Sequence, residues 1–343
     1  FEGVKPMADD NLFKKFVHVR SGKEFDIGFL RESNYIETLG LDAPKLIMSW
    51  DDPNRYLKDE LQIREQDEIE VHLSDDWAMD GMNVKQRFTV IVDPSADRFL
   101  KFNLMATPVF KLKTLSDKTR IFRQRGVAEI VGAISAGFKV DAEKFPVVED
   151  YPCIACERPS AMLRQIASEQ GGHVWFGREG WHVKTLAALF TEEPAFEYHY
   201  GKPGADFQII SFTRPSQQSR VQEQAVRGFS GWNDVLGRVK APSAGPVLSK
   251  VSKYAPSLNA SQNVQTLGNR PTSSCIAIDF QTYGNGFLTP GMVLKLWWHR
   301  ATPDRPLDES LPDKVVIHSV AHFYSAQKYY CRVKGAVPFE PTA

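Results

Sequence analysis

The sequence lacks several features that would assign it to a common functional class. No apolar run approaches the ~20 residues of a membrane-spanning helix, so we expect no membrane insertion. Only 4 cysteines occur in 343 residues, too few for a disulfide framework. Lys and Arg number 42 and Asp and Glu also number 42, which argues against a dedicated nucleic-acid binder or a polybasic membrane-surface protein. No secretory leader is evident, but the sequence opens at Phe1 without a Met, so its true N-terminus stays open.

Familiar catalytic motifs are absent as well. The sequence holds no GxGxxG after a strand, no P-loop, no HExxH and no GxSxG. Cys153 and Cys156 form a lone CxxC in a segment that reads as extended, where side chains three apart point to opposite faces. This geometry favours buried structural thiols over a shared metal or redox site. We therefore expect no enzyme, and we assign no catalytic, cofactor-binding or metal-binding residue.

Two groups of residues leave a chemical alternative open. His318 and His322 lie four apart in a strand-like segment, which favours a stacking or interface role over a metal site. Trp297 and Trp298 could form a platform for a sugar ring, although packing at the end of a strand is the simpler interpretation.

The balanced total charge hides a segregated pattern. Residues 51–80 contain eleven acids and three basic residues, whereas residues 101–125 contain seven basic residues and one acid. Residues 201–300 contain eleven basic residues and four acids. The acidic block could contain a paired general acid and base, but the sequence singles out no pair. Solvated surface is the simpler interpretation, and the sharper hypothesis is that an acidic face of one copy meets a basic face of the next.

Hydropathy periodicity predicts a mainly β, α+β protein. Alternating residues indicate strands at 16–19, 69–73, 88–92 and 100–104, then at 207–212, 275–280, 290–296, 315–320 and 329–333. Apolar residues at helical spacing in 121–138 and after Pro159 indicate two helices, the second ending at Gly171-Gly172. An aromatic-rich hairpin over 173–185 follows.

The strand series at the two ends resemble each other. The spacing between the first two strands of each series is similar, because Val90 lies 21 residues after Ile69 and Ile317 lies 24 residues after Val293. We therefore predict two small antiparallel β-barrels flanking an α+β insertion, with domains at 1–115, 116–222 and 223–343. Residues 241–274 hold four Pro, seven Ser and no acid, which predicts an extended arm.

Two segments resemble a known family. Residues 151–176 resemble a strand, an "LRxLAxEEG" helix and a hairpin of phage tail baseplate hub proteins, and they are similar to the N-terminal part of type VI secretion spike proteins. The residues that match this helix are Leu163, Arg164, Gln165, Ile166, Ala167, Glu169 and Gly171. Residues 288–296, followed by 315–322, resemble the last barrel of the same family, "L-x-P-G … V-x-x-V-x-H". The chain departs from the family in its arm, and because the sequence stops at Ala343 soon after the second barrel, we expect the spike to be a separate protein.

The resemblance implies a structural hub. It implies a homotrimer that adapts a hexameric tail tube or distal tail proteins to a trimeric central spike protein. It also implies a central channel through which genome DNA passes without specific binding. Baseplate wedge and tape-measure proteins are further expected partners, and the expected location is the virion tail baseplate, assembled in the host cytoplasm. The alternatives are an envelope-acting enzyme or carbohydrate-binding β protein of a tail or secretion apparatus, with Trp297, Trp298, His318 and His322 near its site, and a soluble monomeric β protein.

Overall fold

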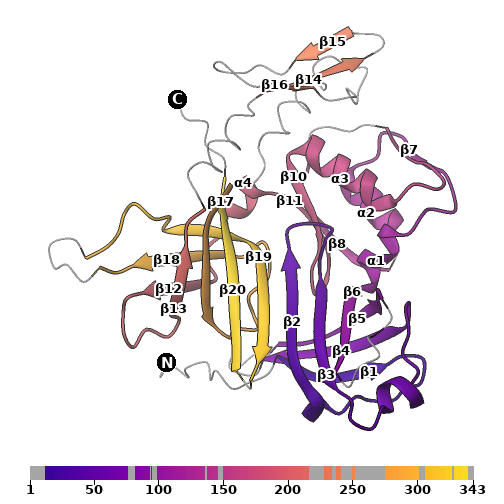
Figure 1. Ribbon diagram of the computed structural model, residues 1–343. Coiled ribbons are helices and arrows are strands. Elements are labelled where there is room, and N and C mark those ends of the chain that lie inside the picture. Colours follow the sequence, from indigo (N-terminus) through magenta and orange to yellow (C-terminus); the bar gives the residue numbers. More distant parts are fainter. Residues whose placement is uncertain are drawn as a thin grey trace. The chain divides into compact units, whose positions relative to one another are not determined.

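Figure 1 shows the computed structural model of the chain. The chain forms two compact units. It describes residues 12–75, 82–92, 94, 99–135, 137–145, 150–215, 228–233, 237–240, 249–251, 275–300, 306–326 and 328–338. Unit 1 comprises residues 1–111, 193–213 and 278–335, and unit 2 comprises residues 112–192, 214–277 and 336–343. The sheet of unit 1 is therefore made from both ends of the sequence. The three-domain division with boundaries at 115 and 222 stays a prediction.

The first strand group of unit 1 comes from the N-terminal part of the chain. Its elements are β1 (Phe13–His18), η1 (Ile27–Phe29), β2 (Leu30–Thr38), β3 (Lys45–Asp51), η2 (Tyr56–Glu60), β4 (Glu68–Asp75), β5 (Met82–Val90), β6 (Phe99–Ala106) and α1 (Thr107–Lys113). The strands follow the order β1-β4-β5-β6-β3-β2, and every pairing in this path is antiparallel.

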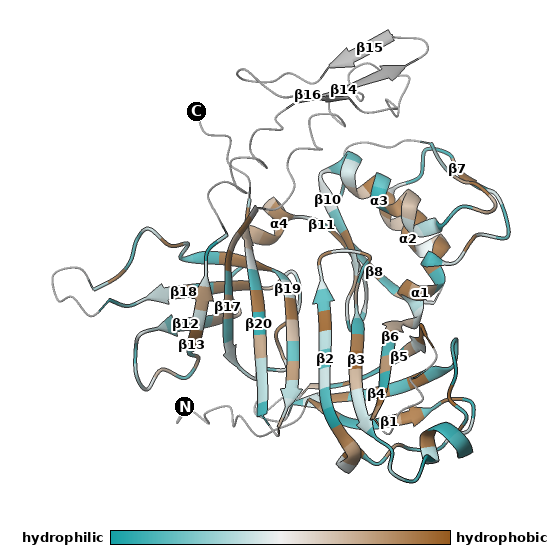
Figure 2. Cartoon of the chain, in the orientation of Figure 1, coloured by the Kyte–Doolittle hydropathy of each residue, from teal (hydrophilic) through white to brown (hydrophobic). Residues whose placement is uncertain are grey.

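The second strand group of unit 1 comes from later parts of the chain. Its elements are β12 (Phe196–Tyr200), β13 (Ile209–Thr213), β17 (Cys275–Tyr283), β18 (Val293–Trp298), β19 (Lys314–Ser325) and β20 (Lys328–Val337). Strand β19 pairs antiparallel with β2, from Ser319 opposite Thr38 to Ser325 opposite Glu32. This seam joins the two groups into one sheet of 12 strands. Figure 2 shows hydrophilic and hydrophobic residues alternating along its strands, as expected for a sheet with one buried face.

The mainly β, α+β fold class is confirmed. The two repeated strand series, β4-β5-β6 and β18-β19-β20, are both runs of consecutive neighbours in the sheet. In the second group, a single parallel bridge between His199 and Gln208 brings β13 back to β12. No pairing between named strands of the described residues closes either group into a barrel, so barrel closure stays a prediction.

Aromatic residues fill the interior of the first group. The Phe16 and Trp50 rings meet edge to face with centroids 5.1 Å apart, and Phe25 meets Trp50 in the same way at 5.4 Å. Buried and more exposed side chains alternate along β1, β3 and β6, so their large side chains converge on one side. Fully burying such side chains stabilises the fold by ~1.5–3 kcal/mol each.

Unit 2 contains the two predicted helices, α2 (Val127–Ile134) and α3 (Pro159–Gln170), and the predicted hairpin of β10 (Gly172–Phe176) and β11 (Gly180–Thr185). The first helix is shorter than the 121–138 that the sequence predicts, because β7 (Arg120–Phe122) precedes it. The other elements of this unit are β8 (Lys139–Ala142), β9 (Tyr151–Cys153), α4 (Leu186–Phe190), β14 (Gly228–Asn233), β15 (Gly237–Lys240) and β16 (Ser249–Val251). Pro159 starts α3 and Gly171 ends it in the left-handed conformation at φ 65°, as the sequence indicates. Apart from the backbone of β16, the predicted arm at 241–274 lies outside the described residues. No described helix is long and apolar enough to cross a membrane.

Candidate functional site

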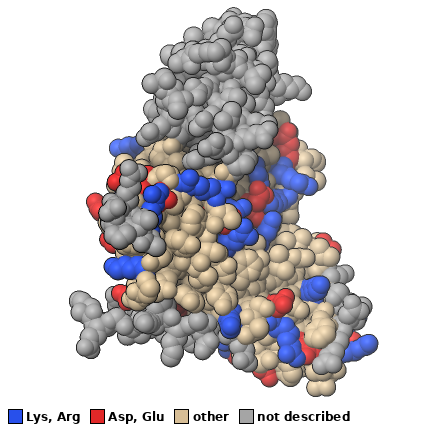
Figure 3. All heavy atoms as spheres, turned by 60° about the vertical axis from the view of Figure 1, so that its left-hand side comes forward, with Lys and Arg blue, Asp and Glu red and all other residues tan. Residues whose placement is uncertain are grey.

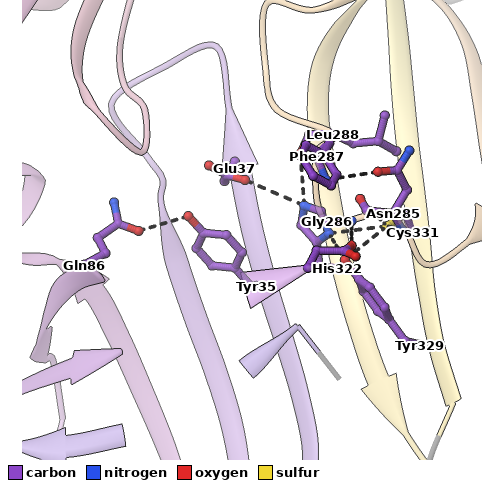
Figure 4. Close-up of polar contacts among 11 residues, drawn as sticks. Tyr35, Glu37, Gln86, Asn285, Gly286, Phe287, Leu288, His322, Tyr329 and Cys331 are labelled. Atoms are coloured by element: carbon purple, nitrogen blue, oxygen red, sulfur yellow. Dashed lines mark hydrogen bonds and ion pairs between the residues drawn. The ribbon is translucent and has the colours of Figure 1, made fainter. Parts of the chain in front are cut away.

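A loop of the second strand group, residues 284–288, enters the interior of unit 1 and contacts several buried polar side chains (Figure 4). The Asn285 side chain is buried, donates to the Tyr198 hydroxyl at 3.0 Å and accepts from the Phe287 amide at 3.0 Å. The Gly286 amide donates to Asp75 of β4 at 2.5 Å. One short loop thus ties strand β4 of the first group to strand β12 of the second.

His322 lies beside this loop and faces the seam between the groups. Its Nε2 is 3.2 Å from the Leu288 carbonyl oxygen and 3.6 Å from Oε2 of Glu37 on β2. A carbonyl can only accept, so Nε2 carries a proton. Its Nδ1 is 2.7 Å from the Tyr329 hydroxyl and 3.3 Å from the Cys331 sulfur, both on β20. The polar junction, which we define as Glu37, Asp75, Tyr198, Asn285, His322, Tyr329 and Cys331, therefore bridges both strand groups.

The polar junction has the residue types of a catalytic triad but no access for a substrate. A thiol, an imidazole and a carboxylate within reach of one another can activate a nucleophile. Here Cys331, His322 and Glu37 are each at most 1% exposed. Burial also raises the pKa of Tyr198, which keeps its hydroxyl neutral. What the arrangement can do is fix the geometry of the seam, because each buried polar group left without a partner would cost ~1–3 kcal/mol.

The two glycines of the loop explain how closely it packs. A Cβ at Gly284 would overlap the ring of Tyr329, and one at Gly286 would overlap the carboxylate of Asp75. The residues Gly284, Asn285 and Gly286 follow the predicted strand at 275–280, but nothing in the sequence indicates that this loop enters the interior. Glu37 and Asp75 were likewise missed, because acids are expected on the surface.

The alternative site residues do not form one cluster. Trp297 is half-buried, donates to Glu197 at 3.0 Å, stacks on His199 and has Lys295 over its ring. His322 instead belongs to the buried polar junction, and His318 is half-buried on the same strand. Trp298 is 3% exposed and donates to the Pro312 carbonyl at 2.7 Å. Neither Trp therefore presents an open ring as a sugar platform.

The cysteines do not share one environment either. Cys153 is buried in β9 whereas Cys156 is exposed at φ 67°, so the expectation of two buried thiols is wrong for Cys156. The turn after Ile154 changes the direction of the chain, and the strand-like alternation does not extend to Cys156. Cys331 is buried, and the side chain of Cys275 lies outside the described residues.

Most of the acidic block is engaged inside unit 1. Asp51 pairs with Arg31 at 2.6 Å, and Asp52 accepts from the Leu57 amide at 3.0 Å. Three further acids of the block contact basic or histidine side chains of unit 1; these are Asp67 with Arg20 and His18, Glu68 with Arg87, and Glu70 with Arg87 and His72. The hydrogen bond from His72 lowers the pKa of Glu70. Charge reversal at Asp67, Glu68 or Glu70 would therefore disturb the fold itself, which makes these residues unsuitable probes of a contact between copies.

In unit 2, the packing of helix α3 explains the residues of the motif that resembles the family. Glu169 of α3 is fully buried and accepts from the Tyr151 hydroxyl at 2.8 Å and from the Gln165 amide at 2.9 Å. Met162, Leu163 and Ile166 bury the apolar stripe of the same helix. The motif thus describes how a helix packs against a strand, and it carries no chemistry of its own.

Three solved structures share this architecture. A 43 kDa tail protein of prophage MuSo2 from Shewanella oneidensis has a TM-score of 0.62 at 12% identity, covering 95% of this chain and 97% of its own. A tail protein from Neisseria meningitidis has a TM-score of 0.63 at 12% identity, with 94% and 95% covered. Prophage tail protein gp18 from Listeria monocytogenes has a TM-score of 0.51 at 9% identity, with 93% of each chain covered.

Sequence comparison gives no such relative: no protein-family model and no curated protein matches the chain. The likeness is one of three-dimensional structure and extends over nearly the whole chain, including the α+β elements between the two strand groups. The resemblance that the motifs indicated is thus confirmed at the level of architecture, and the chain has the fold of prophage tail proteins.

Proposed function

We propose that the protein is a structural baseplate hub of a phage tail that works as a homotrimer. The observation that carries this proposal is the fold, which is shared with tail proteins over 94–95% of the chain. A homotrimer in which each copy contributes two strand groups would present six related modules. Such a ring can meet a six-fold tube on one side and a three-fold spike on the other, so the protein would adapt one symmetry to the other.

The polar junction supports this role physically. A symmetry adaptor has to hold its two strand groups at a fixed angle, because six modules must form one regular ring. Hydrogen bonds are directional, so a buried polar network holds one arrangement where an apolar contact would tolerate sliding. The β2–β19 pairing and the polar junction behind it together make the two groups one body.

The proposed partners follow from the same role. They are the tail tube or distal tail proteins, a central spike protein and, in addition, wedge or tape-measure proteins. Genome DNA would pass through the central channel without being held. The protein would assemble in the host cytoplasm and reside in the virion at the tail baseplate.

Two measurements test the proposal. Native mass spectrometry over rising protein concentrations should reveal a trimer, and negative-stain images of that species should show three-fold symmetry with a central opening. A chain that stays monomeric at the highest concentration, both alone and with its tail-tube protein, would contradict the hub. Cleavage of peptidoglycan by the purified protein would instead favour the enzyme alternative.

A further inference from the structure

The C-terminal end of strand β18 brings two histidines together. His199 lies in β12, and His299 directly follows the last residue of β18, 100 positions later in the chain. The parallel pairing of the two strands places His199 opposite Trp297. The Nδ1 atom of His199 and the Nε2 atom of His299 are 3.1 Å apart. We call these two residues the histidine pair.

Backbone and ring contacts hold the histidine pair in place. The His299 amide donates to the Tyr200 carbonyl at 2.9 Å, and the His199 amide donates to the Phe207 carbonyl at 2.9 Å. The His199 ring stacks on the rings of His299 and Trp297, with centroids 5.3 and 6.2 Å apart. Both side chains of the pair are half-buried, so they are ordered by the fold and still accessible to a dissolved ion.

The separation of the two nitrogens suits a shared metal ion. Two nitrogens that bind one tetrahedral Zn²⁺ ion at ~2.0–2.1 Å lie ~3.3 Å from each other. In the pair, one of the facing nitrogens carries the proton of the hydrogen bond between the rings. A change of tautomer moves that proton to the other nitrogen of the same ring, and small ring rotations then direct both lone pairs at one ion.

The charges around the pair also suit a cation. Burial and the charges of Lys202 and His299 lower the pKa of His199, whereas Glu197 and Asp206 act in the opposite direction. The two carboxylates therefore attract positive charge to the position of the His199 ring. Figure 3, which turns the side of β12 and β18 forward, shows acidic as well as basic side chains there.

Other histidines have different partners. His18 lies between the Ser21 hydroxyl at 2.9 Å and the Asp67 carboxylate at 3.3 Å, and it is fully buried. His182 of unit 2 is half-buried like the pair, but its Nδ1 lies 3.4 Å from Asp141 and its ring stacks on a tryptophan. Neither has a second imidazole beside it, and His182 therefore provides a matched control.

We propose that the histidine pair binds one divalent transition-metal ion through His199 Nδ1 and His299 Nε2. Imidazole nitrogens suit Zn²⁺, Cu²⁺ and Ni²⁺, whereas Mg²⁺ and Ca²⁺ prefer oxygen ligands. The remaining positions of the ion would be filled by water. Among the named strands of the described residues, β12 pairs with β18 alone, so the ion would add a second link at this edge of the sheet. The inference does not depend on the proposed trimer.

Calorimetric titration with Zn²⁺ tests the site. The parent is the full chain without a histidine tag, and it carries Cys156→Ser, because an exposed thiolate is itself a metal ligand. It should bind one Zn²⁺ ion and should not bind Mg²⁺. His199→Gln and His299→Gln should each weaken Zn²⁺ binding by more than ~10-fold, since even the loss of an outer-shell partner costs a metal site that much. His182→Gln should bind Zn²⁺ as the parent does.

Electron paramagnetic resonance of bound Cu²⁺ identifies the ligands. The parent should show coupling to two imidazole nitrogens, and this result does not require any histidine variant to fold. Equal Zn²⁺ affinity of the parent and both variants would place the ion elsewhere and overturn the site. A parent that binds neither ion would show that the pair forms a hydrogen bond only. Circular dichroism checks the fold of each variant, and native mass spectrometry follows the trimer separately, so the proposed function can fail without the metal site and the reverse.

Discussion

Two regions of the interior of unit 1 are held together in different ways. Inside the first strand group, aromatic rings pack together, with Phe16, Phe25 and Trp50 in mutual contact. At the seam, the polar junction combines residues of both groups, and in it Asn285 and His322 each have several hydrogen-bond partners. An apolar core is non-directional and tolerates volume-conserving change, whereas a buried polar network demands one geometry. We infer that the aromatic cluster mainly supplies stability and the polar junction mainly supplies orientation.

The largest expected effect is on the aromatic core. Trp50→Ala should lower the free energy of unfolding by about 3–5 kcal/mol, because it removes the ring that meets Phe16 and Phe25 and leaves a cavity. Urea denaturation measures the change. Trp50→Phe refills most of the cavity and should cost less; equal losses for both substitutions would indicate that Trp50 acts through something other than packing.

A tight glycine comes next. Gly284→Ala should cost about 1–3 kcal/mol, because its Cβ would overlap the ring of Tyr329 and force the loop away from the polar junction. Gly126→Ala is the matched control, since a Cβ there meets nothing within 4 Å. Thermal unfolding of the two variants gives the comparison, and a harmless Gly284→Ala would show that the junction is looser than its contacts indicate.

The polar junction should tolerate change poorly. Asn285→Ala removes a hydrogen-bond partner of the buried Tyr198 hydroxyl and the acceptor of the Phe287 amide, and it should cost about 1–3 kcal/mol. Met48→Leu, a volume-conserving change in the apolar core of the first group, should cost less than about 1.5 kcal/mol. Denaturant midpoints of the pair measure the contrast, and the reverse ranking would break the distinction between the two interiors.

The smallest effect concerns a surface histidine pair of the second group. His199 Nδ1 lies 3.1 Å from His299 Nε2, and burial, Lys202 and His299 together lower the pKa of His199. Just below the ordinary value of about 6.5, the folded protein therefore binds fewer protons than the unfolded chain. The free energy of unfolding is consequently higher above that pH and decreases as the pH falls through this range. NMR titration should place the His199 midpoint below 6.5, and His299→Gln should raise it. A midpoint at or above the ordinary value would show that the pair is open to solvent.

Local patterns predicted the most regular elements of the fold. Strands β4 and β6 and helix α3 follow regular alternation or helical spacing, so their bounds could be read closely. Strands β2 and β3 were missed, although β2 forms the seam with β19. Ser33 and Glu37 are polar residues on the buried side of β2, and they disguise the alternation that marks a strand.

The candidate site was predicted less well, because its residues are scattered. His322 was noticed for its spacing from His318, but its partner Glu37 lies 285 residues earlier in the chain. The Cys153–Cys156 motif drew attention because its members are neighbours in sequence, yet only one of them is buried.

The sequence by itself determined the fold class, the order of its parts and the helix-and-hairpin motif of the family resemblance, because those depend on periodicity, caps and local contacts. Only the tertiary structure decided that both ends of the chain build one sheet. The tertiary structure also decided which acidic residues form ion pairs within unit 1, and which remote residues contact the buried carboxylates. The physical reason is distance along the chain: hydrophobic patterning records which way each side chain points, but not which remote strand lies beside it.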